Sequence, residues 1–277
     1  MPDILEALMV ADIRAACDIL RPVNDDSGHV DGYVSLEVSP HLAYHPEASV
    51  HKALHLFQTV NRPNLFIKIP GTRPGLAAIE QLLFDGINVN ITLLCSVSRY
   101  EAVAETSIRA LERRREEGLP LDAVASVASF FLSHTDVLGN QLLEQRIVPP
   151  NGATPRPDPK ELLGKAGAAN AKLAYRSFKR ILASERWLQL EERGARVQRM
   201  LWASHPHQKS RLRRHDVRGA AHRPGNCEHH AGEAHQSVRR PWRGAAEYRG
   251  ARRRRGSPGH RRSRRPAHRL RRSGGAA

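Results

Sequence analysis

The run NLFIKIP at residues 64–70 is a short apolar segment with a single lysine inside it. Pro70 and Gly71 close the run, and its length and apolar character are typical of a buried β-strand. Burial of the Lys68 ammonium group would remove its hydration and favour the neutral amine. A neutral amine in a dry pocket is the nucleophile that forms an imine with a carbonyl group. The alternative is a lysine whose side chain extends to water at the strand end.

The sequence on both sides of this run alternates between strand and helix patterns. Further strands are predicted at residues 33–38, 88–94, 124–132 and 197–203, and helices at residues 4–20, 45–60, 74–84, 98–117 and 165–184. The first helix carries an apolar stripe of Ile4, Leu5, Leu8, Met9, Ile13, Ala16 and Leu20. Residues 140–163 contain a proline-rich loop. Strands that alternate with long helices favour parallel βαβ units, here five of them.

Polar side chains recur toward the carboxyl ends of these predicted strands. Glu37, Lys68, Asn90, Thr92 and Ser129 lie there, in four consecutive strands. In parallel α/β folds this end of the sheet is where binding and catalytic sites are built. Any one of these residues could be a hydrogen-bonded core residue, but four strands with the same feature indicate a site.

Six segments resemble a known family. YVSLEVSP, NLFIKIPGT, GINVNITLL, SVASFF and GARVQRMLWAS are similar to successive barrel strands of the transaldolases, and GKAGAANAKLAYRSFKRIL to a helix between them. They occur in order across residues 31–204. The resemblance implies an incomplete (β/α)8 TIM barrel with about five of its eight strands, in residues 1–204.

The same resemblance implies a class I, Schiff-base aldolase of the non-oxidative pentose phosphate pathway. Such an enzyme transfers a dihydroxyacetone unit from a ketose phosphate to an aldose phosphate, with sugar phosphates as its partners and no metal or organic cofactor. The resemblance implies that Lys68 forms the imine and that Glu37 transfers protons through a water held with Thr92. Asn90 and Ser129 are assigned to the substrate hydroxyls, and Ser204 to the start of the phosphate site.

Two departures from the family pattern bear on activity. The family begins with two further strands that carry a general-base aspartate and a Thr-Ser-Asn-Pro run, and this chain begins after both. The family also has a phosphate-binding arginine where this chain has His134, a weaker and pH-dependent partner for an anion. We therefore expect an N-terminally truncated enzyme that is inactive and poorly folded by itself.

Residues 205–277 differ sharply in composition from the rest of the chain. They contain 21 basic and 4 acidic residues, whereas residues 1–204 contain 23 basic and 24 acidic ones. With few aliphatic residues this tail cannot bury a core, so we expect it to be disordered. One interpretation is a basic arm that binds nucleic acid through phosphates.

The alternative interpretation of the tail is translation in the wrong reading frame. Permitted codons for the residues from His205 onward, read one nucleotide later, yield IHTKNPAYDDM and further transaldolase-like sequence. We prefer this interpretation, and expect no specific nucleic acid partner. Cys17, Cys95 and Cys227 form no C-x-x-C pair, and no apolar run is long enough to span a membrane. A cytoplasmic protein is expected.

Overall fold

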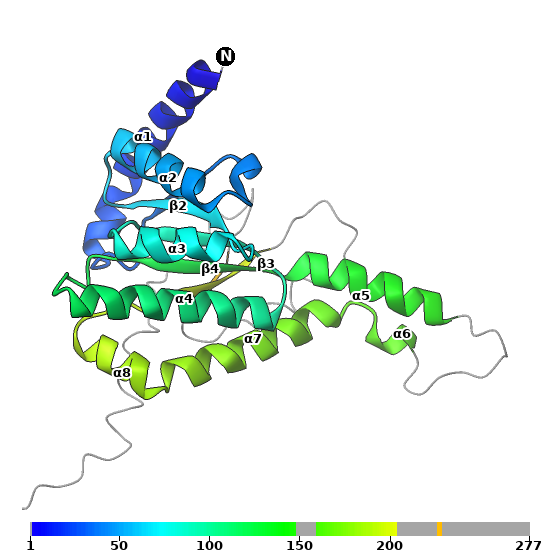
Figure 1. The fold of residues 1–277 in the computed structure, drawn as a ribbon. Coiled ribbons are helices and arrows are strands. Elements are labelled where there is room, and N and C mark those ends of the chain that lie inside the picture. Colours follow the sequence, from blue (N-terminus) through cyan, green and yellow to red (C-terminus); the bar gives the residue numbers. More distant parts are fainter. Residues whose placement is uncertain (1, 148–158, 204–225, 229–277) are drawn as a thin grey trace, which may run out of the picture.

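A computed structural model describes residues 2–147, 159–203 and 226–228 of the 277-residue chain. Its strands form one sheet in the order in which they occur along the chain, and all neighbours are parallel (Figure 1). The strands are β1 Val34–Glu37, β2 Leu65–Pro70, β3 Val89–Leu94, β4 Ser126–Phe131, β5 Arg199–Ala203 and β6 Asn226–Glu228. The first five lie within the predicted strands, which confirms the α/β class and the consecutive βαβ units of a partial barrel.

The sixth strand was not predicted. β6 comes from the basic tail and pairs with β5 in parallel, Met200 opposite Asn226 and Trp202 opposite Glu228. Backbone pairing needs no apolar side chains, so a three-residue strand can form from a sequence that is unable to build a core. The rest of the predicted disordered tail, at 205–225 and 229–277, lies outside the described residues.

Helices connect the strands and cover one face of the sheet (Figure 1). They are α1 Pro2–Asp26, η1 Pro40–Leu42, α2 Pro46–Val60, α3 Gly75–Phe84, α4 Val97–Glu116, α5 Leu132–Ile147, α6 Pro159–Leu162, α7 Ala166–Leu182 and α8 Glu185–Glu192. α5 continues to Ile147, so the proline-rich loop predicted from residue 140 begins later. The loop residues at 148–158 lie outside the described part.

α1 is confirmed as a helix, and its predicted apolar stripe packs only in part, through Met9 and Ile13, which lie against the main core. Val10, Cys17 and Asn24 are buried against the body, whereas Ile4, Leu5 and Leu8 are more than half exposed. The face with Val10 and Cys17 lies toward α2 and β1, and the sequence alone shows neither of these neighbours. The packed face is therefore centred on Val10 and Cys17 and overlaps the predicted stripe at Met9 and Ile13.

The helix-facing side of the sheet forms the main hydrophobic core. Ile67, Ile91 and Ala128 on neighbouring strands are fully buried there, together with side chains from the helices such as Leu82 and Val103. These strand residues alternate with the residues of the opposite face, as the pleat of a β-strand requires. Strand alternation thus fixes which side chains remain for a site.

The opposite, inner face of the sheet carries a small apolar cluster where the strands begin. Phe66 and Val127 are buried there, and the Tyr33 ring lies 4.3 Å from the Phe66 ring between centroids. Arg196, just before β5, donates hydrogen bonds to the His29 carbonyl (3.1 Å) and the Tyr33 hydroxyl (3.5 Å), just before β1. The first five strands therefore curl toward one another, as barrel strands do.

Candidate active site

Lys68 and Glu37 form an ion pair on the inner face of the sheet. They lie opposite each other in the register of β1 and β2, and Lys68 Nζ donates to Glu37 Oε2 over 3.2 Å. The prediction that both side chains lie on the same side of the sheet is confirmed. The Lys68 amine is more exposed to water than the sequence predicted, because the Lys68 side chain is 27% exposed and that of Glu37 is 50% exposed.

A chain of hydrogen bonds runs beside this ion pair across the inner face. Ser129 on β4 donates to Asn90 Oδ1 over 2.7 Å, and Asn90 Nδ2 donates to Ser35 Oγ on β1 over 3.0 Å. Asn90 lies opposite Lys68 in the register of β2 and β3. Asn90 and Ser129 are nearly fully buried, so their side-chain dipoles are held by each other rather than by water.

Ser35, which accepts the hydrogen bond from Asn90, was not predicted as a site residue. The signal was present, because Ser35 lies two residues before Glu37 and so on the same face of β1. A serine in a short strand was not distinctive enough to be chosen without knowing its partner. The register of β1, β2 and β3 brings Ser35 within reach of Asn90 across Lys68.

Thr92 lies one layer farther toward the carboxyl ends of the strands. It is 1% exposed, two residues beyond Asn90 on the same face, and opposite Pro70 in the register. The structure gives its side chain no direct contact with Glu37. A water held between Thr92 and Glu37 therefore stays a prediction.

The backbone changes direction immediately after Thr92. Leu93 has a positive φ of 63°, and the pairing of β3 with β4 shifts between Ile91 and Leu94. This bulge turns Leu94 into the helix-side core and leaves Leu93 54% exposed. Bulges re-aim side chains beside sites. Here the bulge allows Thr92 to stay on the inner face while Leu94 joins the core.

Gly71, just after β2, contacts β3 next to this bulge. Its N–H donates to the Thr92 carbonyl over 2.8 Å, and a Cβ placed on Gly71 would lie 2.6 Å from Leu94 Cδ2. A side chain at position 71 would therefore push the Leu94 side chain aside and crowd the Thr92 carbonyl oxygen, 3.1 Å away. The two strands that carry Lys68 and Thr92 are fixed to each other at their carboxyl ends.

The residues predicted for phosphate binding are only partly described. His134 lies exposed in the first turn of α5, and its ring centroid is 5.5 Å from that of Phe131 in an edge-to-face arrangement. The first turn of a helix favours anions because its N–H groups and dipole point outward. Ser204 lies outside the described residues.

Neither a metal site nor a membrane span is found in the part of the chain that the structure describes. No cluster of three or more His, Cys, Asp or Glu side chains could hold a metal ion among residues 2–147, 159–203 and 226–228. Within the same residues no helix is both long and apolar enough to cross a bilayer. The candidate site brings together an amine, a carboxylate, hydroxyls and an amide.

Comparison with known proteins places this arrangement in a family. Residues 1–208 match the family described as Transaldolase/Fructose-6-phosphate aldolase. The chain belongs to this family. It is 50% identical over 204 residues to transaldolase 2 of Nostoc punctiforme, 47% over 200 residues to a transaldolase of Acidothermus cellulolyticus, and 45% over 194 residues to one of Mycobacterium bovis.

The extent of these matches is as informative as their identity. They cover 73%, 72% and 70% of this chain but only 53%, 51% and 50% of the relatives, in the same order. The chain therefore spans about half the length of the curated relatives it matches. The family match ends at residue 208, close to the change in composition after Ser204.

Proposed function

We propose that this chain carries the imine-forming half of a transaldolase-type active site, with Lys68 as the nucleophile. The observation that supports this most directly is the Lys68–Glu37 pair at 3.2 Å, flanked by the Ser35–Asn90–Ser129 hydrogen bonds on the neighbouring strands. The proposed substrates are ketose phosphates as donors and aldose phosphates as acceptors, as the resemblance to the transaldolases implies.

The chemistry requires the amine to lose a proton and attack a carbonyl carbon. Glu37 lies where it can accept that proton from Lys68 Nζ. After attack, a proton returns to the carbinol oxygen and water leaves, which gives an iminium. In a complete transaldolase a base then removes the proton of the C4 hydroxyl, the C3–C4 bond breaks to release an aldose phosphate, and the iminium takes up the electron pair. Asn90 and Ser129 would position the sugar hydroxyls beside this carbon.

Reductive trapping tests the assignment of Lys68. Borohydride converts an iminium to a stable secondary amine, so incubation of the chain with fructose 6-phosphate and borohydride should add the sugar mass to Lys68, read by peptide mass spectrometry. Lys68→Ala should abolish the adduct. Lys52→Ala is the matched control, because Lys52 is 33% exposed and ion-paired to Glu6, much as Lys68 is to Glu37. Equal labelling in Lys68→Ala and in the unchanged chain would refute the proposal.

We further propose that this chain forms the imine without completing transfer. The general-base aspartate that the family resemblance implies has no counterpart among its residues, and the loss of one positioned acid or base typically lowers a rate about 10²- to 10⁴-fold. Release of glyceraldehyde 3-phosphate from fructose 6-phosphate, coupled to a dehydrogenase, measures turnover. Transfer at the rate of the Nostoc punctiforme relative would contradict this part of the proposal.

A second function on the same site is direct aldol cleavage without transfer. The name of the matching family includes fructose-6-phosphate aldolase, and both reactions would use the same imine. Product analysis with sedoheptulose 7-phosphate and glyceraldehyde 3-phosphate separates them. A transferase yields erythrose 4-phosphate and fructose 6-phosphate, whereas an aldolase releases free dihydroxyacetone.

For the tail we propose out-of-frame translation rather than a nucleic-acid-binding arm. The end of the family match at residue 208 supports this, because the basic composition begins at nearly the same position. Resequencing the gene across the codons for residues 200–210 tests it, and an unshifted frame that is confirmed in the transcript would overturn it. A salt-dependent shift of a DNA fragment by the full chain would support the basic-arm alternative.

A further inference from the structure

The side chain of Asn170 joins three elements at the carboxyl end of the sheet. Asn170, near the start of α7, donates through Nδ2 to the Cys95 carbonyl (2.8 Å) and to Thr135 Oγ1 (3.3 Å). Thr135, in the first turn of α5, donates to the same Cys95 carbonyl over 3.2 Å. Cys95 lies directly after β3, so α5, α7 and the end of β3 meet at one carbonyl oxygen. Both lone pairs of that oxygen therefore have a donor.

The backbones of α5 and α7 also approach each other closely here. The Gly167 N–H donates to Oδ1 of the buried Asp136 over 3.2 Å. A Cβ at position 167 would lie 2.9 Å from the Leu132 carbonyl oxygen and 3.3 Å from Asp136 Cβ. A glycine is therefore required where the first turn of α7 meets the first turn of α5.

These contacts connect two parts of the candidate site. β3 carries Asn90 and Thr92 on the inner face of the sheet. The first turn of α5 carries His134, at the position where the family resemblance implies a phosphate-binding side chain. The pairing of β3 with β4 is irregular between Ile91 and Leu94, so contacts beyond Leu94 help to fix the end of the strand.

We propose that Asn170 is a positioning residue that sets where the sugar phosphate binds relative to the Lys68 amine. It holds the first turn of α5 against the end of β3, and its amide does not need to touch the substrate. This inference rests on the proposed function, because it takes Lys68 as the imine former and the first turn of α5 as the place of the phosphate. It adds to that function a residue on α7, a helix that carries none of the predicted site residues.

Loss of the Asn170 amide should weaken phosphate binding and leave imine formation intact. The two ends of the sugar are held by different elements, the carbonyl carbon by Lys68 on β2 and the phosphate by α5. The first turn of α5 must therefore stand at a fixed distance from the amine. One hydrogen bond of this kind changes an equilibrium about fivefold, so we expect an effect of that size on the binding of a phosphorylated sugar.

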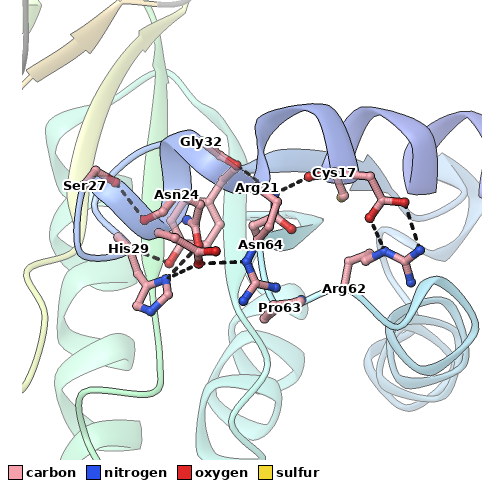
Figure 2. A network of polar contacts seen from close by, with 12 residues as sticks. Cys17, Arg21, Asn24, Ser27, His29, Gly32, Arg62, Pro63 and Asn64 are labelled. Carbon is pink, nitrogen blue, oxygen red and sulfur yellow. Dashed lines mark hydrogen bonds and ion pairs between the residues drawn. The ribbon is translucent and has the colours of Figure 1, made fainter.

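A similar network at the amino ends of the strands provides a comparison. The buried Asn64 side chain, just before β2, donates to the Cys17 carbonyl in α1 and to the Gly32 carbonyl ahead of β1, each over 2.9 Å (Figure 2). Asn64 thus joins three elements as Asn170 does, but away from the end of the sheet that carries Thr92. Removal of its amide should lower stability without changing the affinity for a phosphorylated sugar.

Reductive trapping with two sugars tests the proposal in the full chain. Labelling of Lys68 in the presence of borohydride is measured against the concentration of fructose 6-phosphate and, separately, of dihydroxyacetone, which forms an imine but has no phosphate. Asn170→Ala should raise the half-saturating concentration of fructose 6-phosphate about fivefold and leave that of dihydroxyacetone unchanged. Thr135→Val removes the other donor to the Cys95 carbonyl and should act in the same direction. It also keeps the test valid if Asn170→Ala does not fold.

Two controls separate positioning from a loss of stability. Asn140→Ala removes the acceptor of the Gly164 N–H (2.8 Å) on the same helix α5, more than one turn beyond Thr135. Asn64→Ala acts at the opposite ends of the strands. Both should leave the half-saturating concentrations of the two sugars unchanged, while urea unfolding records the loss of stability in every variant.

The outcomes distinguish this inference from the proposed function. An equal rise for both sugars in Asn170→Ala, or the same rise in Asn140→Ala, would mean that Asn170 acts on the fold as a whole and would overturn the inference. No change with fructose 6-phosphate in either Asn170→Ala or Thr135→Val would overturn it as well. If neither sugar labels Lys68 in the unchanged chain, the proposed function fails and this inference fails with it.

Discussion

The two faces of the sheet are made by the same strands but carry different kinds of side chain. The outer face is mostly apolar, with Ile67, Ile91 and Ala128 buried under the helices. The inner face changes along the strands, from the rings of Tyr33 and Phe66 near the strand starts to Lys68 and Asn90 farther on.

This difference shows how one short strand serves stability and chemistry at once. Lys68 can lie between Ile67 and Ile69 because its neighbours along the chain point into the core while it points to the other face. The core sets where the backbone lies, and the backbone sets where the amine lies. A change on the outer face should therefore act on folding, and one on the inner face mainly on the site.

The largest expected loss of stability comes from one of two substitutions that place an aspartate at neighbouring positions of β3, one on each face of the sheet. Ile91→Asp puts a carboxylate into the fully buried core without a partner and should cost more than about 4 kcal/mol, enough to prevent folding. Asn90→Asp should cost about 1–2 kcal/mol, because Ser129 can still donate to the new carboxylate and Lys68 is nearby. Chemical denaturation followed by circular dichroism measures both. Equal destabilisation by the two substitutions would mean that the inner face is as closed as the core.

Much of this arrangement could be predicted from the sequence because alternation within a strand is local. Residues 64–70 predict a strand with Lys68 on the face opposite Ile67 and Ile69. The parallel units predict that Glu37, Asn90 and Ser129 lie toward the same end of the sheet as Lys68. The role of Ser35 could not be predicted, since it depends on which residue lies across two strands. The packed face of α1 and the strand β6 depend on distant neighbours in the same way, and a helix with apolar residues on two sides gives no local signal of which side is buried.

The second prediction compares two neighbouring apolar residues that point to opposite faces. Ile67→Ala should lower the free energy of unfolding by about 3–4 kcal/mol, since the fully enclosed core cannot collapse around the cavity. Phe66→Ala should cost about 2 kcal/mol although it removes a larger side chain. Phe66 belongs to a small cluster with Ala125 and Val127, where the remaining side chains can relax. Urea unfolding of the two variants gives the comparison directly. A cost for Phe66→Ala above that of Ile67→Ala would show that the inner cluster is packed as tightly as the core.

The smallest effect is expected at the outermost surface of the helix layer, where charges hold α8 to α4. Arg186 donates two hydrogen bonds of 2.8 Å to Glu112 and two of 2.9–3.0 Å to Glu105. The hydrogen bonds from Arg186 hold the pKa of Glu112 below its ordinary value of 4.5. Arg186→Gln should cost about 1 kcal/mol at neutral pH, because the Arg186 side chain is 48% exposed and water screens the pair.

The pH dependence of that loss identifies its cause. A carboxylate whose folded pKa is lowered stabilises the fold fully above its unfolded pKa, here near 4.5, and loses this contribution as the pH falls through the folded value. The difference between the unchanged chain and Arg186→Gln should therefore be constant from pH 7 to about pH 5 and shrink below pH 4.5. Arg180→Gln is the control, because Arg180 is 71% exposed and pairs with Glu101 alone in the described part of the chain, so it should change stability by less than about 0.5 kcal/mol. Thermal unfolding of the three proteins between pH 3 and pH 7 measures this. A difference that persists unchanged at pH 3 would assign the effect of Arg186 to packing of its alkyl stem rather than to charge.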